Sequence, residues 1–144
     1  MKITDTDLKE IIERKYVFEH GVYYFCEGFI ISEVNEGVDY SWGIVKEVIE
    51  IATNYYGKEA TICLISNRIN QYSINPLGWH NFFKSGRKIN GLAVVSYTEN
   101  SMVSVAIEML FFNSKLERFH NIYEAINWAR ELNLEKQTTS IKDD

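Results

Sequence analysis

The stretch from Ser66 to Pro76, SNRINQYSINP, gathers the polar side chains of this sequence that are best suited to hold a ligand or a partner. The arginine at position 68 can bind a carboxylate or a phosphate through two parallel hydrogen bonds. The amide side chains can donate to and accept from polar groups, and a tyrosine adds an amphipathic surface of the kind enriched at interfaces. The residues predicted to bind a partner or ligand are therefore Asn67, Arg68, Asn70 and Tyr72.

The position of this stretch also suits a binding site. It follows an apolar, strand-like run, residues 61–65, and leads into a helical pattern that begins at Pro76. Ligands of open parallel sheets bind beyond the carboxyl ends of the strands, and a helix N-terminus offers free N–H groups to an anion. The alternative is a long turn, in which the asparagines adopt left-handed conformations and Arg68 is braced by a carboxylate such as Glu36 or Glu99. Both interpretations fit the sequence.

No pattern of catalytic or metal-binding residues accompanies this stretch. His20, His80 and His120 are far apart, without an HExxH motif or the Cys–His spacing of zinc sites. The sequence also lacks the GxSxG, P-loop and GxGxxG motifs. We therefore predict no catalytic residue, no metal and no cofactor, and the protein is not expected to be an enzyme.

Two kinds of titratable residue lie inside apolar runs. Cys26 and Cys63 are predicted to be buried free thiols, although a disulfide between them is an alternative. Glu33 lies near the end of an apolar run and is predicted to be solvated, the alternative being a carboxylate with a raised pKa.

Composition limits the class of protein and of partner. The chain has 144 residues, a length typical of one domain, and 46% of them are hydrophobic, which is enough for a core. The net charge of −5 comes without a basic stripe, which argues against nucleic acid and anionic membranes as partners. The apolar runs are far shorter than the ~20 residues of a membrane span, and the polar, acidic N-terminus argues against secretion. We therefore expect a cytoplasmic protein.

The order of hydrophobic periods predicts a single α/β domain. Residues 5–14 have helical spacing, and the runs 15–19, 22–26 and 29–34, separated by short glycine turns, predict an antiparallel meander. Helices and strands then alternate, with expected bounds 40–56, 61–66, 76–85, 91–97, 101–112, 116–120 and 122–132. This pattern predicts a mixed β-sheet with about four helices packed on it. The expected organisation is an N-terminal extension over 1–14, the domain over 15–132 and a polar, frayed tail over 133–144.

Two phrases, FIISEVNEGVDYSWGIVKEVIEIATNYYG and ISNRINQYSINP, resemble small bacterial STAS-like proteins, which are related to anti-sigma-factor antagonists and to CRAL-TRIO lipid-binding domains. The resemblance covers roughly residues 15–132 and implies a STAS-like fold that binds partners rather than catalyses a reaction. Regulatory members carry an Asp-Ser pair before the second helix, and its serine is phosphorylated. Ser73 is the nearest serine here and is the phosphorylation candidate, with Tyr72 in place of the aspartate.

Two functions follow from these observations. The first is a non-enzymatic, regulatory module that acts through protein–protein contacts, and the edge strand of the meander also suggests a homodimer. The second is a carrier of a small apolar or lipid-like ligand, held between the sheet and helices 76–85 and 101–112. A cavity lined by Trp79, Phe82, Phe83 or Met109 would favour the carrier, whereas a solid core would favour the interaction module.

Overall fold

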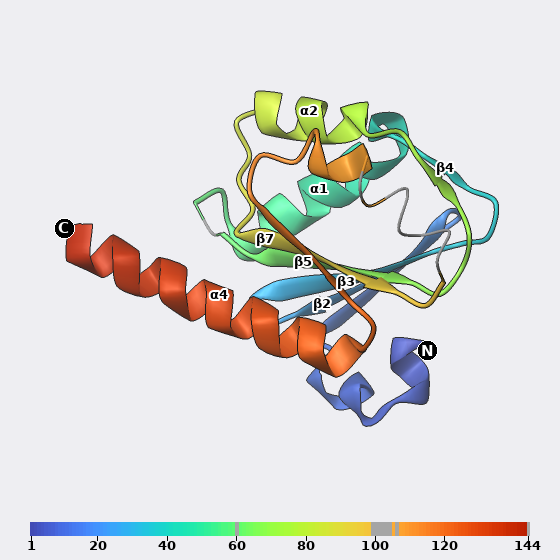
Figure 1. The fold of residues 1–144 in the computed structure, drawn as a ribbon, viewed down its shortest axis with the longest axis horizontal. Helices are drawn as coiled ribbons and strands as arrows, with labels where there is room; N and C mark the ends of the chain where they lie inside the picture. The colour runs from blue at the N-terminus through green and yellow to red at the C-terminus, as the bar shows by residue number, and fades with distance from the viewer. Residues whose placement is uncertain (60, 99–104, 106, 144) are drawn as a thin grey trace.

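The computed structural model describes the backbone of residues 1–59, 61–98, 105 and 107–143, and their side chains as far as residue 138 (Figure 1). Its main feature is a six-stranded mixed sheet with the strand order β1-β2-β3-β5-β7-β8. The strands are β1 (Arg14–Phe18), β2 (Gly21–Cys26), β3 (Phe29–Val34), β5 (Cys63–Arg68), β7 (Gly91–Ser96) and β8 (Lys115–Phe119). The shorter strands β4 (Asp39–Tyr40) and β6 (Ser73–Ile74) form a separate parallel pair.

Helices cover both faces of this sheet. Figure 1 shows α1 (Trp42–Tyr56) and α2 (Leu77–Lys84) on one face and α4 (Ile122–Asp143) on the other. The fold is therefore the single α/β domain with a mixed sheet that the sequence predicted. No helix in the described part of the chain combines the length and the apolar character needed to cross a membrane.

The antiparallel meander is confirmed. β1 pairs with β2 and β2 with β3 in antiparallel fashion, and Tyr24 lies opposite Ile31. From β3 onwards the neighbours β5, β7 and β8 are parallel, as expected for strands connected by helices. The β-branched and aromatic side chains of the three predicted runs, and the glycine turns between them, explain why the sequence was sufficient here.

The strand β5 starts and ends two residues later than the predicted strand 61–66. Asn67 and Arg68 therefore belong to β5 and pair with Val95 and Ser96 of β7, rather than lying in a loop. The physical reason is the sheet itself: a neighbouring strand supplies hydrogen bonds that hold polar residues in an extended conformation, whatever their own propensity.

The beginning of the chain also differs from its prediction. Instead of one helix over residues 5–14, two short 3₁₀ helices are present, η1 (Ile3–Asp5) and η2 (Asp7–Ile11). Thr6 separates them, because its hydroxyl accepts a hydrogen bond from the backbone N–H of Leu8 at 3.1 Å and starts a new turn. Ile3 is fully buried in the core between the sheet and α4, so this segment packs as part of the domain.

The last helix is longer than predicted. α4 continues to Asp143 instead of ending at residue 132, so the tail predicted over 133–144 is helical through Asp143. Residues 122–143 contain no glycine or proline and include several strong helix formers. Asn133 also anchors the middle of α4, since its side chain donates to the Gly28 carbonyl at 2.9 Å. Within the helix predicted over 101–112, residues 101–104 and 106 lie outside the described residues, while residues 105 and 107–109 are helical.

Cys26 and Cys63 are buried, free thiols in the core between the sheet and α4, as the first interpretation predicted. Burial raises the pKa of each thiol to about 12. At pH 8 the reactive thiolate is then roughly one ten-thousandth of each cysteine.

We expect neither cysteine of the folded protein to react with a thiol reagent such as DTNB at pH 8, whereas both should react at once in denaturant. The measurement is the absorbance of the released thionitrobenzoate with and without guanidinium chloride. Rapid labelling of one cysteine in the folded protein would contradict the burial of that thiol.

Candidate functional site

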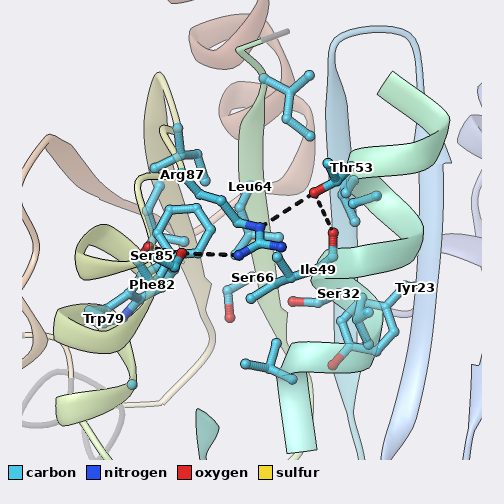
Figure 2. Close-up of a pocket in the computed structure, with 18 of the residues that line it drawn as sticks. Tyr23, Ser32, Ile49, Thr53, Leu64, Ser66, Trp79, Phe82, Ser85 and Arg87 are labelled. Carbon is cyan, nitrogen blue, oxygen red and sulfur yellow. Dashed lines mark hydrogen bonds between the residues drawn. The ribbon is translucent and has the colours of Figure 1, made fainter. Parts of the chain in front are cut away.

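A pocket of about 450 Å³ lies on the sheet face that carries α1 and α2, and we call it the inter-helix pocket (Figure 2). Its floor is the sheet, one wall is α1 and the other is α2 with the segment that follows it. A volume of this size falls in the range of pockets that hold small molecules.

The floor of the pocket follows from strand register. Ile30 of β3 is paired with Leu64 of β5, and Leu64 is paired with Leu92 of β7. Because side chains of parallel neighbours in register point to the same face, these three residues form a continuous apolar strip. All three line the inter-helix pocket.

The walls follow from helical spacing. α1 contributes side chains three or four positions apart, which share one face of a helix: Val45, Val48, Ile49, Ala52 and Tyr56. α2 contributes Trp79 and Phe82. Phe83 and Phe112 pack against Trp79, with ring centroids 6.4 and 4.8 Å away, and so support that wall from outside the pocket. Met109 does not line the pocket and is half exposed.

A polar end of the pocket lies towards the carboxyl ends of the strands. Ser32 and Ser66 are register neighbours two residues beyond the apolar strip, and Arg68 follows on β5. The Arg68 Nη2 atom forms an ion pair with Glu108 Oε2 at 2.6 Å, and its Nε donates to the Ser66 hydroxyl at 3.1 Å. Trp79 Nε1 donates to the other carboxylate oxygen of Glu108 at 3.2 Å. The side chains of Arg68 and Glu108 are 5% and 2% exposed, so this is a buried, charge-balanced pair.

Tyrosine hydroxyls complete the polar end. The hydroxyls of Tyr72 and Ser66 are 3.2 Å apart, those of Tyr23 and Tyr40 are 2.7 Å apart, and His20 Nε2 lies 2.8 Å from the Tyr23 hydroxyl. Burial raises the pKa of Tyr23, Tyr40 and Tyr72. These three hydroxyls are therefore neutral at ordinary pH.

The opposite end of the pocket carries Arg87. Its Nη1 donates to the Ser85 hydroxyl at 3.1 Å, and its Nε lies 3.5 Å from the Thr53 hydroxyl of α1 (Figure 2). The guanidinium thus connects the segment after α2 with α1. Lys58 and Lys88 also line this end, together with one carboxylate, Glu59.

The structure does not bring the four predicted binding residues into one site. Arg68 and Tyr72 line the inter-helix pocket, whereas Asn67 donates to Glu33 Oε2 at 2.7 Å and to the Met1 carbonyl at 2.9 Å. Asn70 donates to the Val34 carbonyl at 3.0 Å.

The alternative interpretation of this stretch as a long turn is also corrected in its details. No non-glycine residue in the described ranges has a positive φ, so the asparagines at 67, 70 and 75 do not adopt left-handed conformations. The carboxylate that binds Arg68 is Glu108; Glu36 instead accepts from the Gln71 N–H at 2.8 Å, and Glu99 lies outside the described residues. Asn75 precedes α2, and its Oδ1 accepts a hydrogen bond from the Leu77 N–H at 3.1 Å.

Ser73 lies apart from the pocket. It is exposed on β6, and its hydroxyl donates to Asp39 Oδ1 at 2.9 Å. Glu33 differs from its prediction: it is only 5% exposed, and Oε2 accepts hydrogen bonds from the Ile3 N–H and from Asn67. The N-terminal segment covers this carboxylate, and the periodicity of a sequence does not reveal where such a segment packs in the fold.

Sequence reasoning missed Ser32 and Glu108. Glu108 stands alone among apolar residues in VAIEMLFF, whereas Arg68 ends β5 directly after the polar residues Ser66 and Asn67. The isolated charge of Glu108 in an apolar segment was a signal for a buried, paired carboxylate, because unpaired buried charges are rare. In the described part of the chain, no group of three or more His, Cys, Asp or Glu side chains is placed to hold a metal ion.

The comparisons with known proteins address the fold. No family model and no curated protein matches the chain. Among solved structures it is similar to an uncharacterized protein of the DUF3478 family, with a SpoIIAA-like fold, from Shewanella loihica PV-4. The TM-score is 0.52 with 11% sequence identity, and the match covers 81% of this chain and 90% of the other. This chain has a SpoIIAA-like fold. The predicted STAS-like architecture is thereby confirmed, and at this identity the similarity concerns the fold alone.

Proposed function

We propose that this chain is a non-enzymatic binding protein that holds a small, predominantly apolar ligand in the inter-helix pocket. The observation that carries the proposal is the 450 Å³ pocket between the sheet, α1 and α2. A solid core at this place would instead have favoured an interaction module. A concave, mostly apolar space of this size, lined by a few polar groups, is typical of small-molecule binding sites. The apolar strip of Ile30, Leu64 and Leu92 gives the ligand a surface to cover.

The size of the ligand can be bounded. A volume of about 450 Å³ corresponds to roughly 15 groups of the size of a water molecule or a methylene. The expected ligand is therefore a compact molecule of about that many non-hydrogen atoms.

Protein contacts through the predicted residues have weaker support. A residue that binds a partner protein must be accessible, and Asn67 and Arg68 are buried, while Asn70 and Tyr72 are partly buried. Of the five predicted residues, Ser73 is the exposed one. A small molecule that enters the inter-helix pocket does meet Arg68 and Tyr72.

A phenylalanine at position 52 tests the proposal, because Ala52 lines the pocket on the α1 side. With N-phenyl-1-naphthylamine, an uncharged dye that fluoresces in apolar sites, we expect saturable binding of one molecule per chain. Ala52→Phe should weaken this binding at least tenfold by occupying the space, and it should change stability by about 1 kcal/mol or less, since it fills a void rather than a packed core.

The matched control is Asn54→Phe, which adds the same ring at an exposed position of α1 outside the pocket. It should bind the dye like the wild type. Equal binding by all three proteins, or no saturable binding by the wild type, would contradict the proposed function.

A further inference from the structure

Ser32 supplies the starting observation. Ser32 is 5% exposed and lines the inter-helix pocket. Its hydroxyl has no hydrogen-bond partner among the residues that the structure describes. Figure 2 shows Ser32 and its register neighbour Ser66 inside the pocket, between the two helix walls. The Ser66 hydroxyl, by contrast, is bonded to Arg68 and Tyr72. The Ser32 hydroxyl thus faces the inter-helix pocket with its hydrogen-bonding capacity unused by the described residues, which suits it to bind a polar group of a ligand.

The charges around Ser32 restrict what that group can be. The positive charge of Arg68 is balanced by Glu108 within the same buried cluster. The neighbouring tyrosines are neutral, because burial raises the pKa of each. A carboxylate or phosphate placed there would be a buried charge without a counter-ion, which is strongly unfavourable. A hydroxyl or carbonyl carries no such cost. Arg68 Nη1, which has no acceptor among the described residues, is a second donor in the same cluster.

The remainder of the pocket suits an apolar body. The strip of Ile30, Leu64 and Leu92 lies two residues before Ser32 and Ser66 along the strands, and Phe82 of α2 lines the same pocket. A molecule with its polar group at Ser32 therefore extends along apolar side chains towards the end that carries Arg87.

We infer that the ligand of the inter-helix pocket is an uncharged amphiphile, whose hydroxyl or carbonyl head is hydrogen-bonded by Ser32 and whose apolar body lies on the strip formed by Ile30, Leu64 and Leu92. This inference rests on the proposed function and adds the chemistry and the orientation of the ligand.

Three matched probes test it: naphthalene, 2-naphthol and 2-naphthoate, each titrated calorimetrically at pH 7. We expect 2-naphthol to bind at least tenfold more tightly than either of the others, because it alone combines an uncharged polar head with the aromatic body. Ser32→Ala should weaken 2-naphthol binding about fivefold or more and leave naphthalene binding within twofold. Ser114→Ala, which removes a hydroxyl outside the pocket, should change neither.

The outcomes separate this inference from the proposed function. If 2-naphthoate binds as tightly as 2-naphthol, the head is anionic, held by the cations at the Arg87 end, and the inference is overturned while the pocket stands. Equal binding of naphthalene and 2-naphthol, or an unchanged 2-naphthol affinity in Ser32→Ala, overturns it as well. The inference is also overturned if N-phenyl-1-naphthylamine binds and 2-naphthol does not. If none of the four compounds binds, the proposed function fails too.

Discussion

Replacing Arg68 with alanine is expected to lower the free energy of unfolding by about 3–5 kcal/mol, because it leaves Glu108 as a buried charge without its partner. The two side chains are almost fully buried and form an ion pair at 2.6 Å. A loop residue at the surface would change stability by only about ±0.5 kcal/mol. The size of the effect therefore distinguishes the buried position in β5 from the loop position that the sequence suggested.

The measurement is the denaturant midpoint at constant slope, with three controls. Glu108→Ala should lower the free energy of unfolding by a similar amount, since it leaves the buried Arg68 guanidinium without its counter-ion. The double variant Arg68→Met with Glu108→Leu should lie close to the wild type, because an apolar pair can replace a buried ion pair. Lys115→Ala breaks the exposed pair with Glu135, 3.7 Å apart, and should cost about 1 kcal/mol or less. A loss below about 1 kcal/mol for Arg68→Ala would contradict the buried pair.

Replacing Glu33 with alanine is expected to lower the free energy of unfolding by about 3 kcal/mol. A hydrogen bond to a charged group contributes roughly 1.5–3 kcal/mol, and two such bonds are lost. Glu33 Oε2 accepts from the Ile3 N–H at 2.9 Å and from Asn67 Nδ2 at 2.7 Å. Both donors belong to buried residues, so neither finds water as a replacement. The N-terminal segment should also loosen, because Ile3 loses its backbone attachment to β3.

Chemical denaturation gives the stability change, and limited proteolysis followed by mass spectrometry reports on residues 1–12. Glu33→Gln should lose less stability than Glu33→Ala, because the amide oxygen of glutamine can still accept a hydrogen bond. Glu36→Ala is the surface control, since its bond to the Gln71 N–H is exposed. An N-terminal segment as resistant to protease in Glu33→Ala as in the wild type would show that the carboxylate does not hold it.

The sequence by itself determined the elements whose residues have strong local preferences. The β-branched and aromatic runs before residue 34 predicted the meander, and the helical spacing of apolar residues over 40–56 predicted α1. Alternating helices and strands then implied the parallel half of the sheet. The meander and α1 were predictable because they depend on contacts between residues close in the sequence, and the parallel half followed from the order of the elements.

Only the tertiary structure decided the site. Arg68 and Glu108 are 40 positions apart, and their pairing depends on the tertiary structure that brings the helical residues 107–109 to the carboxyl end of β5. β5 extends through Arg68 because β7 lies beside it, and Glu33 is buried because the N-terminus returns to it. The inter-helix pocket exists because small side chains on separate elements, such as Ser32 and Ala52, leave the space between the sheet, α1 and α2 unfilled. Packing volume is a sum over residues distant in the sequence, so no local pattern reveals whether such a space is filled or open.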